Sequence, residues 1–304
     1  MNTPTPQVSV VMAVYNAGAY LSPAIDSILT QGFSDFELLV VDDGSTDGSS
    51  GILDSYTACD PRMRVIHQEN AGLTRACRTA VKQARGTYVA RMDTDDIAWS
   101  DRLSIQVAAM DANPALLALG THVRLIDPEG RPLKVLDTPQ SHDAIDGAHI
   151  SGNGQSMICH PTVMMRTDAV RQVGNYNPKF QAAQDIDLFL RLAEVGRVGN
   201  LPNVLLDYRQ HVTSVGYAKR ARQIADAWQA VQDAAVRRGL TLDATTAPQV
   251  TDTQTQGEIW RKWGWWALSD GHVATARHYA HKLLRAAPFS KKNWHFAAMA
   301  WRGY

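Results

Sequence analysis

Acidic residues gather in two short segments of the sequence, Asp42-Asp43 and Asp93-Thr94-Asp95-Asp96. Each segment directly follows an apolar run that is typical of a buried strand. Carboxylates that face one crevice repel one another and raise each other's pKa values unless a cation neutralises them. Because the donors are hard oxygens, with no Cys or His pair nearby, the pattern predicts a Mg²⁺ or Mn²⁺ site with open positions for substrate phosphates.

The elements that must position these acids are indicated by changes in hydrophobic period. Continuous apolar runs predict four strands, and amphipathic stripes between them predict three helices. The predicted strands cover residues 8–14, 36–41, 64–67 and 88–92. A βαβαβαβ order implies right-handed crossovers and a mostly parallel sheet between layers of helices, which is a Rossmann-like α/β fold.

Ligands of such sheets bind in the crevice outside the carboxyl ends of the strands. Polar residues follow each predicted strand, namely Tyr15-Asn16, Asp42-Asp43, Asn70 and the segment 93–96. Any one of these sets has a plain alternative reading, since loop residues are commonly polar. Two acidic doublets at neighbouring strand ends favour one shared crevice. Arg91, inside the fourth strand, is expected to pair with a crevice carboxylate because an unpaired buried charge is costly.

The pattern becomes less regular after residue 112. Further strands are predicted, the first two of them joined as a hairpin, at residues 116–126, 132–136, 162–165 and 203–208. The turn-forming segment 151–154 predicts a loop that orders when an acceptor binds. A helix is predicted to begin at Gln184-Asp185, which places Asp185 in a first turn facing the open end of the sheet.

From Val8 to about Ser214 the sequence resembles the bacterial family 2 glycosyltransferases, which have the GT-A fold. The resemblance rests on the order and spacing of several motifs together. They include Val-Ser-Val-Val-Met-Ala-Val-Tyr-Asn at 8–16, Asp-Asp-Gly-Ser-Thr-Asp at 42–47, Asp-Thr-Asp-Asp at 93–96 and Gln-Asp-Ile-Asp at 184–187. The resemblance implies an inverting hexosyltransferase that moves a sugar from a nucleotide diphosphate, in the first place a UDP-sugar, to a hydroxyl of a glycan or lipid-linked saccharide.

The resemblance also implies roles for residues on the donor side. Tyr15 would lie against the nucleotide base, and Asp43 would accept the imide hydrogen of a uracil. Asn70 would line the same crevice, and Asp93 would act through the ribose or through the water shell of the metal. Asp95 would ligate the metal, Mn²⁺ or Mg²⁺, that bridges the donor diphosphate.

On the acceptor side the resemblance makes Asp185 the general base. Helix capping is the plain alternative for this carboxylate. His211 matches a position where His meets the metal or the diphosphate, although a lone His is more often structural. Asp96 and His160 are candidate acceptor or accessory residues, and so is Gln184, where the family often has Glu.

Two further positions depart from the family pattern on the donor side. Ala13 stands where Pro is common, and Arg78 stands where Asn often lies near the donor. We therefore include both among the candidate donor-binding residues. Both departures bear on donor preference.

The chain is expected to divide into a catalytic domain and a helical appendage. Residues 1–216 would form the catalytic domain, with a nucleotide-binding half at about 1–112 and an acceptor half at about 113–216. Residues 217–304 would be helical, with a polar linker at about 241–256. The last 48 residues hold six of the eight tryptophans and an excess of Lys and Arg over acids. They would form either a helical hairpin packed on itself or on the catalytic domain, or a contact with a membrane surface or a partner.

Composition narrows the function classes. The 30 basic and 30 acidic residues balance, so no global field favours nucleic acid as a partner. The three Cys have no metal-ligand spacing, and no apolar run approaches the roughly 20 residues that span a bilayer. We therefore expect a cytoplasmic protein, which would be peripheral at the inner face of the membrane if the appendage binds a membrane surface.

Two other functions remain open at this point. A sugar-phosphate nucleotidyltransferase would share the fold and the metal, but the segment after the first strand lacks the Gly-rich basic loop of that class. A nucleotide-sugar-binding or scaffold protein without turnover is the second alternative, and the presence of Asp185 argues against it.

Overall fold

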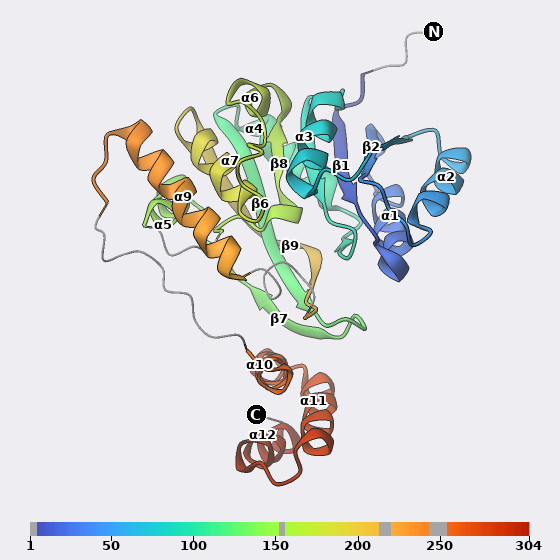
Figure 1. The fold of residues 1–304 in the computed structure, drawn as a ribbon, viewed down its shortest axis with the longest axis vertical. Coiled ribbons are helices and arrows are strands. Elements are labelled where there is room, and N and C mark those ends of the chain that lie inside the picture. Colours follow the sequence, from blue (N-terminus) through green and yellow to red (C-terminus); the bar gives the residue numbers. More distant parts are fainter. Residues whose placement is uncertain (1–4, 152–155, 213–219, 243–253, 304) are drawn as a thin grey trace.

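In the computed structural model the first four strands form a parallel sheet in the order β3-β2-β1-β4. The structure describes residues 5–151, 156–212, 220–242 and 254–303. Figure 1 shows the sheet with helices on both sides. The strands of this half are β1 (Val8–Val14), β2 (Phe36–Asp42), β3 (Met63–His67) and β4 (Tyr88–Met92), and its helices are η1 (Gly18–Tyr20), α1 (Leu21–Leu29), α2 (Ser49–Cys59) and α3 (Leu73–Gln83).

The rest of the sheet continues beyond β4 with antiparallel and parallel pairs. β8 pairs antiparallel with β4 and with β6, β6 pairs parallel with β9, and β5 and β7 pair antiparallel with β9 and β6. The strands are β5 (Ile97–Ala98), β6 (Leu116–Ile126), β7 (Pro132–Leu136), β8 (Met164–Arg166) and β9 (Arg197–Arg209). The helices of this half are α4 (Arg102–Ala112), α5 (His142–Ile150), η2 (His160–Thr162), α6 (Thr167–Gln172) and α7 (Gln184–Ala193).

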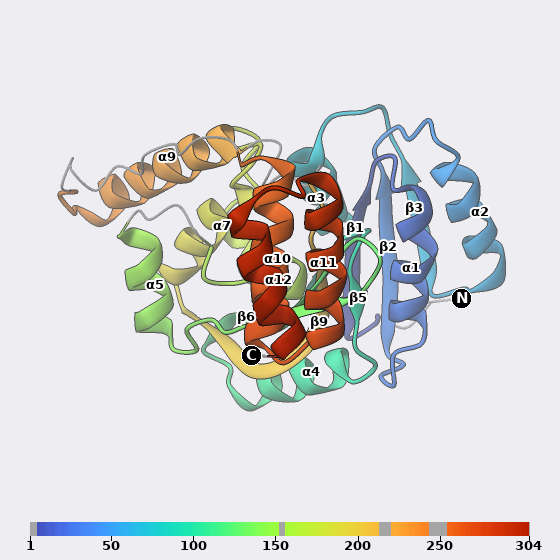
Figure 2. The same ribbon diagram turned by 90° about the horizontal axis from the view of Figure 1, so that it is seen from below.

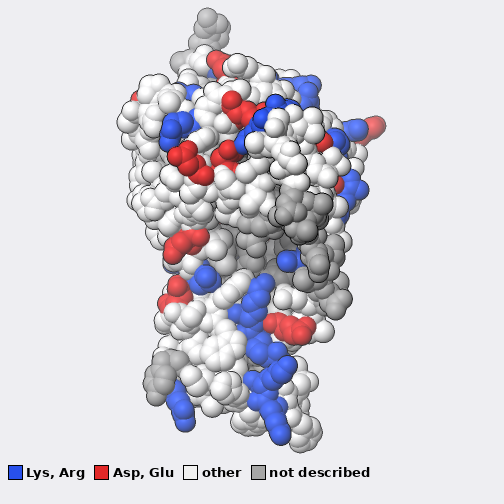
Figure 3. Space-filling view, turned by 90° about the vertical axis from the view of Figure 1, so that its left-hand side faces the viewer, with Lys and Arg blue, Asp and Glu red and all other residues white. Residues whose placement is uncertain are grey.

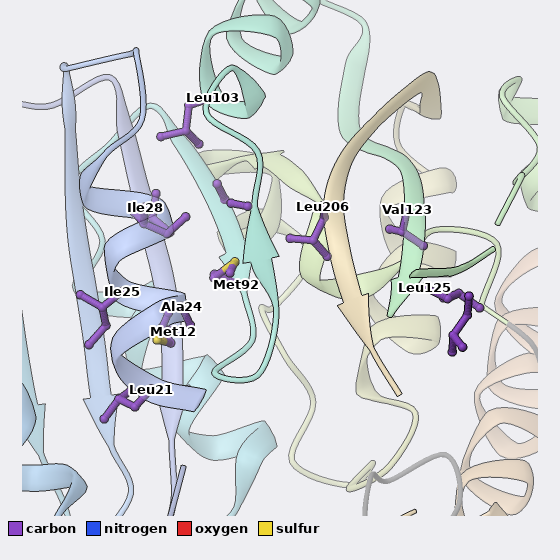
Figure 4. Close-up of a cluster of buried hydrophobic side chains, with 14 of the residues drawn as sticks. Met12, Leu21, Ala24, Ile25, Ile28, Met92, Leu103, Val123, Leu125 and Leu206 are labelled. Atoms are coloured by element: carbon purple, nitrogen blue, oxygen red, sulfur yellow. The ribbon is translucent and has the colours of Figure 1, made fainter. Parts of the chain in front are cut away.

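The apolar strands are buried on both faces of the sheet. Met12 of β1 and Met92 of β4 pack with Ile25 and Ile28 of α1 on one face, as Figure 4 shows, while Val11 packs with α3 on the other. Successive side chains of a strand point to opposite faces of the sheet. A strand that is covered on both faces therefore needs a continuous apolar run. The parallel core therefore follows directly from the runs seen in the sequence.

Four strand predictions differ from the structure. The first concerns residues 203–208, which are only the second half of β9. The strand begins at Arg197, and its pairing with β6 shifts register between Leu201 and Val204, around Pro202. Gly199, Asn200 and Pro202 each disfavour a regular strand, and the irregular pairing is what admits them.

The other three differences are small. Residues 162–165 were predicted to form one strand, but η2 ends at Thr162 and the strand β8 starts at Met164. β3 begins one residue earlier than the predicted 64–67, and β2 ends one residue later than the predicted 36–41. The predicted loop at 151–154 lies largely outside the described residues.

Four further helices follow the last strand, α9 (Arg220–Arg238), α10 (Gln256–Ser269), α11 (Val273–Ala286) and α12 (Lys291–Arg302). α9 packs on α7 through a separate apolar cluster that includes Ile186 and Val231. α10, α11 and α12 pack on one another beneath β7, as Figures 1 and 2 show. Trp263 and Phe296 lie in the buried core of these helices.

The helices of the appendage pack on one another and on the catalytic half. This agrees with the reading in which the segment packs on itself or on the catalytic domain. The polar linker lies mostly outside the described residues, and the domain boundaries remain a prediction. In the part of the chain that the structure describes, we find no helix with the length and apolar character needed to traverse a bilayer.

Candidate active site

The parallel register brings the carboxyl ends of β1, β2 and β4 to one edge of the sheet. Val14 pairs with Asp42 across β1 and β2, and Met12 pairs with Met92 across β1 and β4. The loops after β1 and β2 are also joined, because Thr46 donates its backbone N–H to the Asn16 side chain at 2.7 Å. The predicted gathering of strand-end residues at one edge is therefore present.

Asp42 and Asp43 are both buried, and both carboxylates are hydrogen-bonded. Asp42 accepts from the Ser50 hydroxyl at 2.6 Å and from His67 Nδ1 at 2.9 Å. Burial by itself raises the pKa of Asp42, but hydrogen bonds from Ser50, Ser45 and His67 outweigh it and lower the pKa below its usual value. Asp42 thus holds its own loop together.

Asp43 organises the loop that follows β3. Its Oδ1 accepts from Gln68 Nε2 at 2.7 Å and from the Ala71 N–H at 2.9 Å, and its Oδ2 accepts from the Gly72 N–H at 2.8 Å. A carboxylate oxygen can accept two hydrogen bonds, so Oδ2 keeps capacity for one more donor. That capacity is compatible with the predicted bond from a uracil imide, which remains a prediction.

The other donor-side candidates divide into free and engaged side chains. Tyr15 is 55% exposed directly after β1, and Asn70 is exposed in the loop that Asp43 holds. Ala13 is half-buried near the end of β1. Arg78, in contrast, donates from Nη1 to the carbonyls of Gly174 and Tyr176 at 2.7 and 2.6 Å, which gives it a packing role between α3 and the loop after α6.

The acids of the segment 93–96 have three different environments. Asp93 pairs with the guanidinium of Arg91, which is completely buried in β4, as predicted from the cost of an unpaired charge. Asp95 Oδ2 lies 2.7 Å from His211 Nε2, and the side chains of Asp95 and His211 are 26% and 21% exposed. Asp96 is fully buried.

Asp96 accepts the backbone N–H of Arg209 at 2.8 Å through Oδ1, while its Oδ2 has no partner among the described residues. Burial raises the pKa of Asp96 well above its usual range, and the charges of Asp95 and Asp93 raise it further. The carboxyl does not cap a helix, because α4 starts later, at Arg102 with Asp101 in the cap position. Asp96 instead fastens the segment 93–96 to the end of β9.

Asp185 lies in the first turn of α7 and is half-buried. Burial raises the pKa of Asp185 to about 6, and the charge of Asp93 adds to the rise against the lowering effect of nearby N–H groups. The electrostatic influence of Asp93 agrees with Asp185 facing the same edge of the sheet. At neutral pH this carboxyl is mostly ionised, yet it binds a proton more strongly than an ordinary Asp.

His160 packs against Phe189 of α7, and Gln184 is the first residue of that helix. His160 Nε2 lies 2.7 Å from the Tyr176 hydroxyl, and its ring packs edge-on against Tyr176 and Phe189. Burial lowers the pKa of His160 well below its usual value, so the ring is neutral. Gln184 is buried, and its Oε1 has no hydrogen-bond partner among the described residues.

A model of the family described as Glycosyl transferase family 2 matches residues 9–174, which is more than half of the chain. The chain belongs to glycosyltransferase family 2. It is 34% identical over 211 residues to the putative glycosyltransferase EpsE of Bacillus subtilis, covering 67% of this chain and 73% of the relative. It is 35% identical over 208 residues to the O-antigen biosynthesis glycosyltransferase WbnJ of Escherichia coli, covering 67% and 80%. The chain spans a third or less of several longer relatives.

Solved structures of GT-A glycosyltransferases have the same fold. The mannosyltransferase PcManGT of Pyrobaculum calidifontis, in complex with GDP-Man and Mn²⁺, matches with a TM-score of 0.58 and 18% identity, covering 99% of this chain and 86% of that chain. This family 2 glycosyltransferase is therefore a GT-A enzyme with a nucleotide-sugar donor, and the nucleotidyltransferase and scaffold readings are set aside.

The residues of this glycosyltransferase fit a weakly held divalent cation better than a closed metal cage. No three His, Cys, Asp or Glu side chains within residues 5–151, 156–212, 220–242 and 254–303 are arranged to hold a metal by themselves. Mg²⁺ and Mn²⁺ commonly use one or two protein ligands and complete their shell with water and substrate phosphates. The partly exposed Asp95–His211 pair is compatible with such a site, and its role as metal ligand stays a prediction.

Sequence reasoning missed three residues that help to hold the Asp95–His211 pair in place, namely Arg209, Asp127 and Tyr279. Arg209 donates from Nε to the Asp95 carbonyl at 2.7 Å and from Nη1 to the carbonyls of Asp127 and Pro128 at 3.1 and 3.0 Å. Asp127 is fully buried, and its Oδ2 accepts the Tyr279 hydroxyl at 2.9 Å. The appendage thus touches, through one hydrogen bond, the turn that anchors Arg209.

Of these residues, only Arg209 could have been predicted from the sequence to take part in the site. It stands two residues before His211, and a buried guanidinium without a partner is costly. Asp127 reads as an ordinary turn residue, and Tyr279 as part of an apolar helix stripe. Their pairing spans 152 residues of sequence.

Proposed function

We propose that this enzyme is an inverting glycosyltransferase that transfers a hexose from a UDP-sugar to a hydroxyl group of a glycan or lipid-linked saccharide. The observation that carries the proposal is the position of Asp185. Its carboxyl stands in the first turn of α7 with its pKa raised to about 6 by burial, and the charge of Asp93 acts on it. A base is most effective when its pKa lies near the working pH, because it must be ionised and still bind a proton well.

We assign the donor to the edge formed by β1, β2 and β4. Tyr15 would offer its exposed ring to the nucleotide base, and Asp43 would use its remaining Oδ2 capacity for the imide hydrogen. Asn70, Ala13 and Arg78 border this region, and Asp93 would contact the ribose or water near the metal. The engaged guanidinium of Arg78 favours an indirect effect of that residue on the donor.

Asp95 and His211 would hold Mn²⁺ or Mg²⁺. When bound, the cation supplies Lewis-acid neutralisation of the diphosphate, which makes the nucleoside diphosphate a better leaving group. Arg209 fixes the Asp95 backbone, so the carboxylate is held in position before the donor arrives.

In the transfer step Asp185 would take the proton of the acceptor hydroxyl. The oxygen then forms a bond with the anomeric carbon from the face opposite the diphosphate, and the bond from that carbon to the diphosphate oxygen breaks. The products are the new glycoside and the free nucleoside diphosphate, with the proton on Asp185. Neutral His160 and Gln184 would orient the base or the acceptor without adding a charge, and Asp96 would support them from the far side.

A nucleotide-release assay with UDP-, GDP- and dTDP-sugars and Mn²⁺ or Mg²⁺ tests this proposal. We expect UDP-sugars to be the preferred donors. Asp95→Ala should abolish metal-dependent donor binding, whereas Asp185→Asn should bind the donor normally and fail to transfer. Wild-type transfer by Asp185→Asn would contradict the assignment of the base, and release from GDP-sugars alone would contradict the assignment of the nucleotide.

We also propose the division into a catalytic domain at 1–216 and an appendage at 217–304, in a cytoplasmic enzyme. Residues 257–304 would give it a peripheral contact with the inner face of the membrane. The support for this contact is compositional: residues 256–302 contain eight Lys and Arg against two acids. Trp with Lys and Arg suits the headgroup region of a bilayer.

A further inference from the structure

The first turn of α12 and the facing side of α10 border an open hollow of about 360 Å³. It is lined by Arg261 and Trp265 of α10 and by Lys291, Lys292 and His295 of α12. We refer to it as the basic pocket. Figure 3 shows Lys and Arg side chains running in a line over these helices, with few acids between them.

Among the described residues, the basic pocket has more cations than acids that could neutralise them. Neither Lys291 nor Lys292 forms an ion pair with a described residue, and Arg261 bonds the neutral side chain of Asn293 at 3.0 Å. Glu258 is one acid whose charge interacts with Arg261 and Lys292, and its carboxylate also accepts from the Thr255 N–H and hydroxyl, both at 2.8 Å, in a capping box.

The position of the two lysines sharpens this observation. They occupy the first turn of α12, where the helix dipole is positive and acidic residues are favoured, yet this turn contains no acid and Ser290 makes no capping bond with its side chain. Helix N-termini of this kind bind phosphate groups readily, because the first N–H groups have no partner in the helix. Charge, dipole and hollow therefore favour the same class of ligand, a phosphate-bearing anion.

Exposed aromatic side chains border the basic pocket. Phe289 is 96% exposed in the turn just before α12, and Trp294 is 55% exposed one turn along that helix. The Trp294 indole donates to the Pro288 carbonyl at 2.7 Å, so the ring is held in an outward position. A soluble phosphate ligand gives no reason for such a rim, whereas a bilayer receives aromatic rings beside its headgroups.

We infer that the basic pocket binds the phosphate of an anionic lipid headgroup and that Phe289 and Trp294 enter the bilayer surface beside it. The inference deepens the proposed membrane contact and rests on it, but it does not require the proposed transfer chemistry. It assigns the contact to one end of the three-helix unit, at the turn between α11 and α12.

Co-sedimentation with vesicles tests the inference on the full chain. Phosphatidylcholine vesicles with and without phosphatidylglycerol are compared for wild type, for Lys291→Gln/Lys292→Gln and for a charge-matched control, Lys82→Gln/Arg197→Gln. Both control side chains are exposed and lie outside the three-helix unit. Near an anionic surface each basic residue contributes about 1 kcal/mol, so the pocket variant should lose about thirtyfold in partitioning and the control far less.

Phe289→Ser should lower binding to both kinds of vesicle, since it removes apolar contact and no charge. The inference is overturned if wild type ignores anionic vesicles or if the control variant loses as much as the pocket variant. It is also overturned if inorganic phosphate binds the pocket while vesicles do not. Nucleotide release without vesicles, measured on every variant, should equal wild type; failure of wild type in that assay would refute the proposed transfer while leaving the vesicle result intact.

Discussion

The pH dependence of transfer is the sharpest consequence of the environment of Asp185. A base must be ionised, so kcat/KM should follow the ionised fraction of Asp185 in the free enzyme. With the pKa raised to about 6, that fraction is about 0.9 at pH 7 and about 0.1 at pH 5. We therefore expect about a tenfold fall in kcat/KM between these two pH values.

An unperturbed Asp, with a pKa of about 3.9, would remain more than about 90% ionised at pH 5 and would give almost no fall. The direction is also fixed: activity is lost as the pH drops through the raised pKa. Nucleotide release at limiting donor and acceptor concentrations, with Mn²⁺ held saturating at every pH, provides the measurement.

Two variants make the interpretation specific. Asp185→Asn should lower transfer by about two to four orders of magnitude, the range for loss of a general base, and should remove the pH step near 6. Asp187→Asn is the matched control, because Asp187 is buried in the same helix and paired with Arg191 at 2.5 Å. It should keep the pH midpoint. A midpoint below about 4.5 in wild type, or an unchanged midpoint in Asp185→Asn, would refute the reasoning.

Three further predictions concern the metal, the appendage and the sheet. His211→Ala should raise the Mn²⁺ concentration for half-maximal activity about tenfold or more, whereas Asp95→Ala should abolish the response to Mn²⁺; an unchanged titration in His211→Ala would remove that residue from the site. Tyr279→Phe removes a hydrogen bond to the buried Asp127 carboxylate. The free energy of unfolding, measured by urea denaturation, should therefore fall by about 1.5–3 kcal/mol, and a loss below about 0.5 kcal/mol would contradict this account. Gly86→Ala would place its Cβ 2.4 Å from a backbone nitrogen of β1. We expect the free energy of unfolding to fall by at least about 3 kcal/mol, or no folded protein. Wild-type thermal stability in this variant would show that the strands can move apart at little cost in free energy.

The predicted elements that match the structure are those whose signal is local. β1, β4, β6 and β7 have the predicted bounds, because a strand buried on both faces must be apolar throughout and a hairpin turn is marked by its own residues. Only the second half of β9 was predicted. Its first half contains Gly199, Asn200 and Pro202, which disfavour a strand, and it forms because it pairs with β6. α5 and α6 were also missed, being short helices whose stability comes from packing.

The sequence by itself determined that the first four strands are parallel, that polar residues gather where these strands end, and to which family the chain belongs. These follow from hydrophobic period and from motif spacing, which need no knowledge of distant contacts. Tertiary structure alone decided how the acids divide their roles. Asp42 is taken up by Ser50 and His67, Asp95 faces a histidine 116 residues away, and Asp96 is buried against the backbone of Arg209. The physical reason is that a carboxylate acquires its pKa and its free lone pairs from its neighbours in space, and those neighbours come from every part of the chain.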